Sequence, residues 1–175
     1  MIIYYILAIL LLVLDQWSKL AIVNNFALHE MKEVLPGILS LFYIQNKGAA
    51  WGIFEGRMFF FFIITVVVVG AMVYNAHKQG FDKKIVGISY AFLLSGAIGN
   101  FIDRMRLGYV VDMFRLDFMD FPIFNVADVC LTIGVILMTI YILFMEEEEE
   151  KISSHRSISD KKKKTHHRKD TDHHS

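Results

Sequence analysis

The chain has 175 residues, of which 55% are hydrophobic and 21% are charged. Its 18 Lys and Arg residues balance 18 Asp and Glu residues, which argues against a strongly basic nucleic-acid-binding protein. That balance averages two unlike parts: residues 146–175 hold 8 basic and 8 acidic residues with few large apolar ones, and residues 1–145 hold 10 of each among long apolar runs. Apolar runs of about 20 residues are typical of membrane-spanning segments. Cys130 is the only cysteine, which excludes a disulfide framework.

The first apolar run, about residues 2–23, is long enough to cross a membrane and contains Asp15 and Lys19. A cleaved signal peptide is the alternative. No Lys or Arg precedes the run, and no small-residue cleavage site stands before Asn24, so we favour a permanent span.

A connection from Asn24 to Arg57 follows, and its middle is rich in aromatic and β-branched residues. A Pro36-Gly37 turn precedes Ile38–Gln45, which has the composition of a short strand. We expect a small β-structured element over about residues 34–56, lying at the membrane surface.

Three further apolar runs reach spanning length, at about 58–76, 85–102 and 126–145. All four runs should be helical, because a backbone in lipid must satisfy its own hydrogen bonds. The expected fold is therefore a mainly α membrane protein, a bundle of four transmembrane helices with a small extracytoplasmic β-structured element.

Basic residues predict the orientation of this bundle. The short loop between the second and third spans contains Lys78, Lys83 and Lys84, and the tail 146–175 is rich in Lys and Arg. The positive-inside rule places both in the cytoplasm, together with both termini. We expect the tail to be disordered, because it is poor in apolar residues; its five histidines then belong to a solvated tail, with metal binding as the alternative.

Under this topology the polar residues of the spans gather near the outer membrane face. They lie at the end of the first span, at the end of the third span and its following loop, and at the start of the fourth: Asp15, Lys19, Asn100, Asp103, Arg104, Asn125 and Asp128. Charges within spans are costly and usually face a partner, a cavity or a reaction.

Each carboxylate has a plain structural alternative. Asp15 and Lys19 are four residues apart, so a neutralising ion pair is expected. Asp103 could pair with Arg104 at the membrane boundary, and we expect Asp117 and Asp120 to be solvated. Functional roles are favoured for the remaining two, Asp112 in an apolar stretch and Asp128 within a span.

Carboxylates are the only acid–base groups that the sequence offers near the outer face, since GxSxG and HExxH motifs are absent. Two neighbouring Asp side chains at a low-dielectric boundary repel one another and share one proton. Such a pair can activate water for attack on a carbonyl, as in aspartic proteases. The spacing alone does not show which aspartates form the pair.

Five motifs in order give the chain a family resemblance: DQWSK at 15–19, QNKGAAWG at 45–52, SGAIGNFIDR at 95–104, VVDMF at 110–114 and FNVAD at 124–128. Residues 1–145 resemble the lipoprotein signal peptidases, also called signal peptidase II, and especially Gram-positive members. The resemblance implies a cofactor-free, metal-free aspartic endopeptidase of the bacterial cytoplasmic membrane that cleaves diacylglyceryl-modified prolipoproteins before the lipidated cysteine, and that peptides of the globomycin type inhibit.

The resemblance also implies roles for individual residues. Asp112 and Asp128 match the catalytic pair. The residues expected around the substrate are Asn46, Asn100, Arg104 and Asn125, and those expected to hold the site together are Asp15, Lys19 and Asp103. Two other classes remain open on the residues alone. A proton-coupled transporter would need polar groups towards both faces, and a membrane scaffold would use its carboxylates only in ion pairs.

Overall fold

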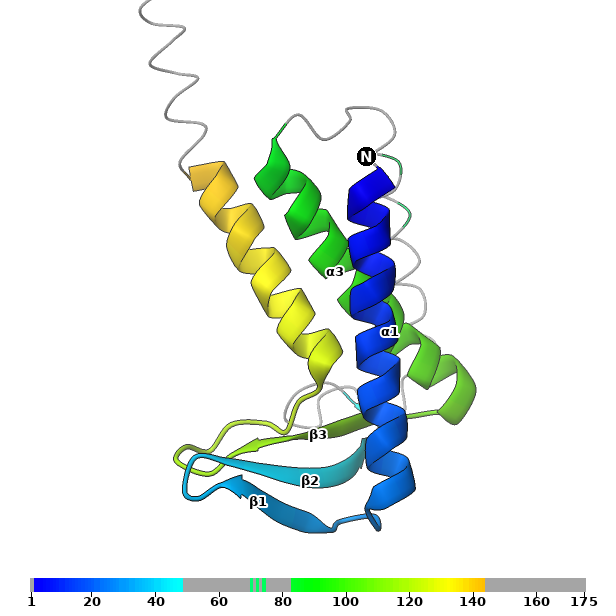
Figure 1. The fold of residues 1–175 in the computed structure, drawn as a ribbon, viewed down its shortest axis with the longest axis vertical. Helices are drawn as coiled ribbons and strands as arrows, with labels where there is room; N and C mark the ends of the chain where they lie inside the picture. The colour runs from blue at the N-terminus through cyan, green and yellow to red at the C-terminus, as the bar shows by residue number, and fades with distance from the viewer. Residues whose placement is uncertain (1, 49–69, 71, 73, 75–82, 144–175) are drawn as a thin grey trace, which may run out of the picture. The chain divides into compact units, whose positions relative to one another are not determined.

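The computed structural model describes residues 2–48, 70, 72, 74 and 83–143. The chain divides into two compact units, Met1–Leu137 and Met138–Ser175, and the elements that position the site lie in the first. Three described helices are long and apolar enough to cross a membrane: α1 (Ile2–Asn25), α3 (Lys84–Leu107) and the unlabelled helix Val126–Leu143, which we call the last helix (Figure 1). Of the second unit, only residues 138–143, the end of the last helix, are described.

Helix α1 turns one narrow face towards the protein. Its buried residues are Ala8, Asp15, Lys19 and Ile22, whose spacing places them along one side of a helix. The rest of its surface is largely apolar and exposed; Ile2 is 77% exposed and Ile9 is 59% exposed. Lipid can cover such a surface without cost, so this pattern suits a transmembrane helix.

Small residues let α3 approach its neighbours closely. Gly99 faces Asp15 of α1, and a Cβ atom there would lie 2.5 Å from Asp15 Oδ2. Gly96 faces the carbonyl oxygen of Ala127 in the last helix, where a Cβ atom would overlap it. Helix α3 ends at Gly108, whose left-handed conformation (φ 77°) lets its N–H donate to the Arg104 carbonyl.

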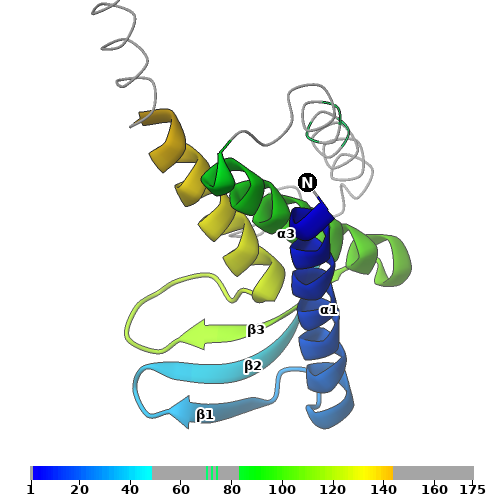
Figure 2. The same cartoon turned by 45° about the horizontal axis from the view of Figure 1, so that its top comes forward.

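Three antiparallel strands form one sheet in the order β1 (Met31–Leu35), β2 (Leu39–Asn46) and β3 (Val110–Leu116). Gly37, with φ 69°, occupies the turn between β1 and β2. In the register of β2 and β3, Ile44 is opposite Asp112 and Asn46 is opposite Val110. The sheet lies near the C-terminal end of α1 (Figure 2).

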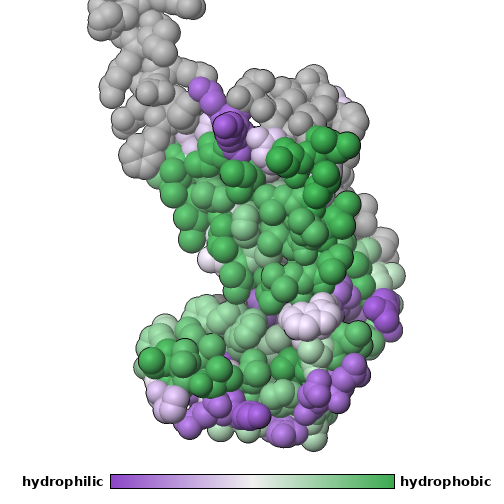
Figure 3. Space-filling model, in the orientation of Figure 1, coloured by the Kyte–Doolittle hydropathy of each residue, from purple (hydrophilic) through white to green (hydrophobic). Residues whose placement is uncertain are grey.

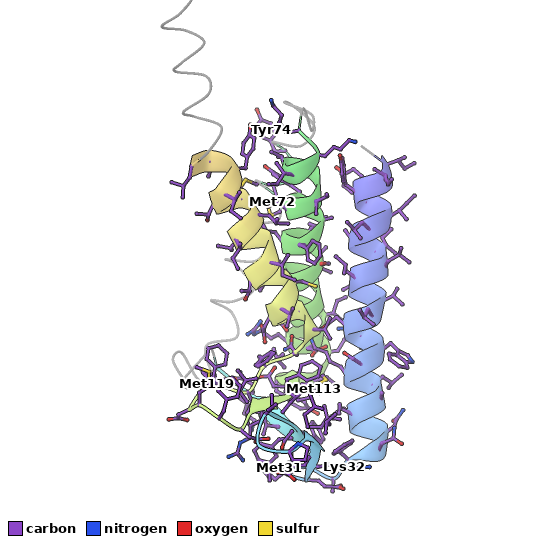
Figure 4. The ribbon with its side chains drawn as sticks, turned by 60° about the vertical axis from the view of Figure 1, so that its left-hand side comes forward. Met31, Lys32, Met72, Tyr74, Met113 and Met119 are labelled. Carbon is purple, nitrogen blue, oxygen red and sulfur yellow. The ribbon has the colours of Figure 1, made fainter. Side chains whose placement is uncertain are left out.

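A small core joins the sheet to α1. Ile22 of α1 packs with Tyr43 of β2 and with Val111 and Met113 of β3, all of which are at most 5% exposed. Figure 4 labels Met113 at this junction. Val111 and Met113 flank Asp112, so the packing of β3 fixes the backbone that carries this carboxylate.

The sequence predictions agree with most of these bounds. The predicted strand Ile38–Gln45 corresponds to β2, and the spans expected at 2–23, 85–102 and 126–145 correspond to the three helices. Helix α3 extends beyond the third predicted span, because it continues to Leu107 and carries Asp103 and Arg104 within the helix. Three predicted segments lie outside the described residues: the span 58–76 (except residues 70, 72 and 74), residues 49–56 of the outer loop, and the tail 146–175.

Candidate active site

A buried lysine connects two transmembrane helices at the base of the site. Lys19 Nζ of α1 lies 2.9 Å from Asp15 Oδ2 and 3.0 Å from Asp103 Oδ2 of α3. It also donates a hydrogen bond to Asn100 Oδ1 over 3.1 Å. These four residues are at most 6% exposed. The expected Asp15–Lys19 pair is therefore present, and the lysine also has Asp103 as a partner.

Gln16 completes this cluster, although it was not among the residues predicted for the site. Its side-chain nitrogen donates to Asp15 Oδ2 over 3.1 Å, to Asp103 Oδ1 over 3.1 Å and to the Gly99 carbonyl over 3.2 Å. The only signal in the sequence is its position next to Asp15 in the DQWSK motif. A polar amide near the end of a span is otherwise unremarkable, and its partners Gly99 and Asp103 become apparent only when α1 and α3 are docked.

Both acids of the cluster also accept backbone hydrogen bonds from other elements. Asp15 Oδ1 accepts from the Ala127 N–H at the start of the last helix over 2.8 Å. Asp103 Oδ2 accepts from the Val111 N–H in β3 over 3.1 Å. The cluster therefore fixes the positions of the residues just before Asp112 and Asp128.

Two asparagines connect the lysine cluster with the remaining carboxylates. Asn100 Oδ1 accepts from Lys19, and the Asn100 side-chain nitrogen donates to Asp128 Oδ1 over 2.7 Å. The side-chain nitrogen of Asn125 donates to Asn100 Oδ1 over 3.1 Å and to Asp112 Oδ1 over 2.6 Å. Because an amide oxygen can only accept and its nitrogen can only donate, these contacts fix the orientation of both amides.

Asp112 and Asp128 approach each other at Asn125, from β3 and from the first turn of the last helix. Asp112 is 1% exposed and also accepts a hydrogen bond from Asn46 of β2 over 2.9 Å. Asp128 Oδ2 accepts from the Asn125 backbone N–H over 3.2 Å. The Asn125 side-chain oxygen accepts from the Asp128 N–H over 3.0 Å, an arrangement that caps the helix.

The surroundings of Asp112 favour its neutral form. Burial, and to a lesser extent the charge of Asp128, raise the pKa of Asp112 to about 7, against the opposing hydrogen bonds from Asn46 and Asn125. Two carboxylates that influence each other in this way retain one proton between them near neutral pH. The arrangement can therefore supply one acid and one base to the same bound molecule.

Arg104 and Asn46 border this pair. The Arg104 guanidinium makes long hydrogen bonds of 3.5 Å to the carbonyl oxygens of Asn100 and Gly48, and its charge acts on Asp128 and Asp112. The Gly48 N–H donates to Asn46 Oδ1 over 2.9 Å, which orients the Asn46 amide so that its nitrogen faces Asp112. All nine residues predicted for the site thus lie in one connected network.

The two loop carboxylates lie outside this network. Asp120 is exposed, as expected. The expectation for Asp117 was wrong, because its side chain is only 16% exposed and accepts a hydrogen bond from the buried Ser40 hydroxyl over 2.6 Å. Arg115 lies 3.6 Å from its other oxygen. Asp117 therefore stabilises the sheet, a role that the pairing of β2 with β3 creates and that its own neighbours in sequence do not indicate.

Comparison with known proteins places these residues in a family context. The sequence model of the family described as Signal peptidase (SPase) II matches residues 7–144. The lipoprotein signal peptidase of Enterococcus faecalis is 51% identical over 147 residues, covering 83% of this chain and 91% of the relative. That of Streptococcus pyogenes serotype M2 is 50% identical, covering 78% and 90%.

Solved structures agree with the sequence comparisons. A bacterial membrane enzyme determined by the in meso method at 2.3 Å superposes with a TM-score of 0.77 and is 39% identical, covering 85% of this chain and 90% of the other. A second such enzyme, determined at 1.9 Å, gives a TM-score of 0.75 at 40% identity, covering 81% and 92%. The resemblance found in the sequence is therefore confirmed over most of the chain.

Proposed function

The chain belongs to the signal peptidase II family, and we infer from this membership that it removes signal peptides from lipoprotein precursors at the bacterial cell membrane. We propose that it does so as an aspartic endopeptidase, with Asp112 and Asp128 as the catalytic pair. The observation that carries this proposal is the position of Asn125, which donates hydrogen bonds to both carboxylates from a fully buried site.

The proposed reaction needs one proton on the pair. The ionised aspartate accepts a proton from a water molecule as its oxygen attacks the scissile carbonyl, while the protonated aspartate donates a hydrogen bond to the carbonyl oxygen. As the tetrahedral intermediate collapses, the leaving nitrogen accepts a proton from the pair. The products are a signal peptide with a free carboxylate and a lipoprotein with a free amino group. The raised pKa of Asp112 supports this mechanism, because it keeps a proton available near pH 7.

The polar residues around the pair are proposed to hold the substrate. Asn46 and Arg104 border the carboxylates, and Asn100 and Asn125 lie between them. Amides and a guanidinium can hydrogen-bond to peptide groups without changing protonation state. We propose that they position a diacylglyceryl-modified prolipoprotein, cleaved just before its lipidated cysteine, and that a globomycin-type peptide would inhibit by occupying the same groups.

Asp15, Lys19 and Asp103 are proposed to support the site without reacting. Lys19 neutralises part of the charge of two buried acids, and both acids hold backbone N–H groups next to the catalytic elements. Removing one partner of a buried ion pair leaves an uncompensated charge, which costs about 3–5 kcal/mol. This role accounts for charged residues inside transmembrane segments without assigning them chemistry.

We propose four spans, with residues 58–76 as the second, and both termini in the cytoplasm. The site then lies near the outer face, where a lipid-anchored substrate can enter from the membrane. Residues 146–175 would form a charged cytoplasmic tail. The support is the lysines of the 77–84 loop and the Lys and Arg content of the tail, since the positive-inside rule counts basic residues and not net charge. Single cysteines introduced near each terminus of the chain, and labelled with a membrane-impermeant reagent in intact cells, would test the orientation.

Cleavage of a purified, diacylglyceryl-modified prolipoprotein tests the catalytic assignment. Asp112→Asn and Asp128→Asn should each abolish the shift in gel mobility, because each removes a carboxylate from the pair. Asp120→Asn is the matched control, since its carboxylate is exposed in the loop between them. Near-normal turnover by either variant of the pair would refute the assignment and would leave the carboxylates as a structural network.

A further inference from the structure

The loop between β3 and the last helix exposes large apolar side chains. Phe118 is 64% exposed, Met119 is 47% exposed and Phe121 is 45% exposed. Figure 3 shows hydrophobic surface at one end of the sheet as well as over the helices, with hydrophilic surface along the opposite edge of the sheet. Clustered exposed hydrophobic residues usually mark a binding surface. We call residues 118–121 the apolar loop.

The apolar loop is held firmly at its base. Phe114 and Phe124 close it with backbone hydrogen bonds of 2.8 and 3.1 Å, and the Phe121 and Phe124 rings meet edge to face at 5.8 Å. The Asp117 N–H donates to the Ile38 carbonyl over 3.0 Å, which ties the loop to the β1–β2 turn. These contacts fix the conformation of the loop, so its apolar side chains are exposed while its backbone is held in place.

The position of the loop indicates what covers it. Figure 4 places Met119 on the side of the sheet nearer the transmembrane helices, and Met31 and Lys32 on the far side. The last helix, which follows the loop in the chain, also exposes apolar side chains, with Val129 at 37% and Val135 at 55% exposure. A loop that lies on the helix side of the sheet and leads into an apolar, exposed helix is placed to meet the same bilayer as that helix.

We propose that the apolar loop inserts into the membrane at the boundary between headgroups and acyl chains, on the side where the site lies. Apolar and aromatic side chains beside polar ones favour this depth. Asp117 is turned towards Ser40, and the exposed Asp120 limits insertion to the level of the headgroups. Because the loop joins the strand of Asp112 to the helix of Asp128, its contact with lipid sets the depth of both carboxylates. This lipid contact does not depend on their being catalytic.

A pair of methionines provides a matched test. Met119 and Met31 have nearly equal exposure, 47% and 51%, on opposite sides of the sheet. Each is replaced by cysteine in a Cys130→Ala background, labelled with an environment-sensitive nitrobenzoxadiazole dye, and reconstituted into phosphatidylcholine–phosphatidylglycerol vesicles. A sharp peak in size exclusion checks the fold of each variant. Phe118→Cys is a second site in the loop, should Met119→Cys be poorly folded.

The proposal predicts a blue shift of the dye at residue 119, quenching by nitroxide lipids labelled near the headgroup, and protection from iodide. The dye at residue 31 should emit as in water and be quenched by iodide alone. Water-like emission at both positions would overturn the proposal. Protection of residue 119 from both iodide and nitroxide lipid would also overturn it, because protein would then cover the loop.

Discussion

The side-chain amide of Asn125 donates a hydrogen bond to Asp112 over 2.6 Å, and Asn125 has no exposed surface. Its backbone N–H donates to Asp128, and its side-chain oxygen accepts from the Asp128 N–H. One residue therefore holds the strand carboxylate and the helix carboxylate together. Since Asn100 fixes the orientation of this amide, the geometry of the pair depends on the network that begins at Lys19.

Replacing Asn125 by alanine should slow cleavage without removing either carboxylate. A hydrogen bond to a charged group contributes about 1.5–3 kcal/mol, which is roughly 10- to 100-fold in rate if it is made in the transition state. Single-turnover cleavage measures this loss. Thr132→Ala is the control, because Thr132 is exposed one turn beyond Asp128 in the last helix and its hydroxyl donates to the Asp128 carbonyl. An Asn125→Ala enzyme as fast as this control would contradict the role given to Asn125.

Cleavage should decline as the pH rises above about 7, the pKa to which burial and Asp128 raise Asp112. Below this pH the pair retains the proton that the reaction needs, and above it both carboxylates are ionised. The same shift affects folding: a carboxyl group whose pKa is raised on folding makes the folded protein less stable as pH increases from its ordinary value towards 7. Initial rates at subsaturating substrate, measured across neutral pH, report the free enzyme. A rate that stays constant well into alkaline pH would argue against a shared proton.

Asn46→Ala should move this alkaline limb to higher pH. The Asn46 hydrogen bond, at 2.9 Å, favours the ionised form of Asp112 and lowers its pKa, so its loss makes Asp112 hold its proton more tightly. Gln45→Ala is the control in the same strand, since its amide donates to Tyr43. The position of the limb is the relevant measurement, whatever happens to the maximal rate. A limb that moves to lower pH would show that another interaction dominates at Asp112.

The sequence was sufficient for much of the fold and for the membership of the site. Apolar runs located three described helices, and the Pro36-Gly37 turn located β2. The motifs selected residues that come together although Asp15 and Asp128 are far apart in the chain, because membrane topology restricts which ends of the spans can meet.

The contacts themselves could not be read from the sequence. Asp103 lies next to Arg104 in the chain but forms an ion pair with Lys19, since the 24-residue helix α3 continues past the predicted boundary and turns Asp103 towards α1. Gln16 reaches Asp103 only when the helices dock, and Asp117 reaches Ser40 only when the strands pair. Local patterns carry no information on such long-range contacts.

Gln16 offers the clearest test of the buried cluster, because two substitutions at it should differ in a definite direction. Gln16→Ala removes the donor to Asp15 and Asp103 and should destabilise the protein by about 1–3 kcal/mol. Gln16→Glu should destabilise it more, since it places a third carboxylate against two buried acids that share one lysine. Thermal unfolding in detergent ranks the variants, with Trp17→Leu as the control at a neighbouring position that is 65% exposed. Equal unfolding temperatures for the two Gln16 variants would contradict this, because they would show that added negative charge at position 16 does not destabilise the cluster.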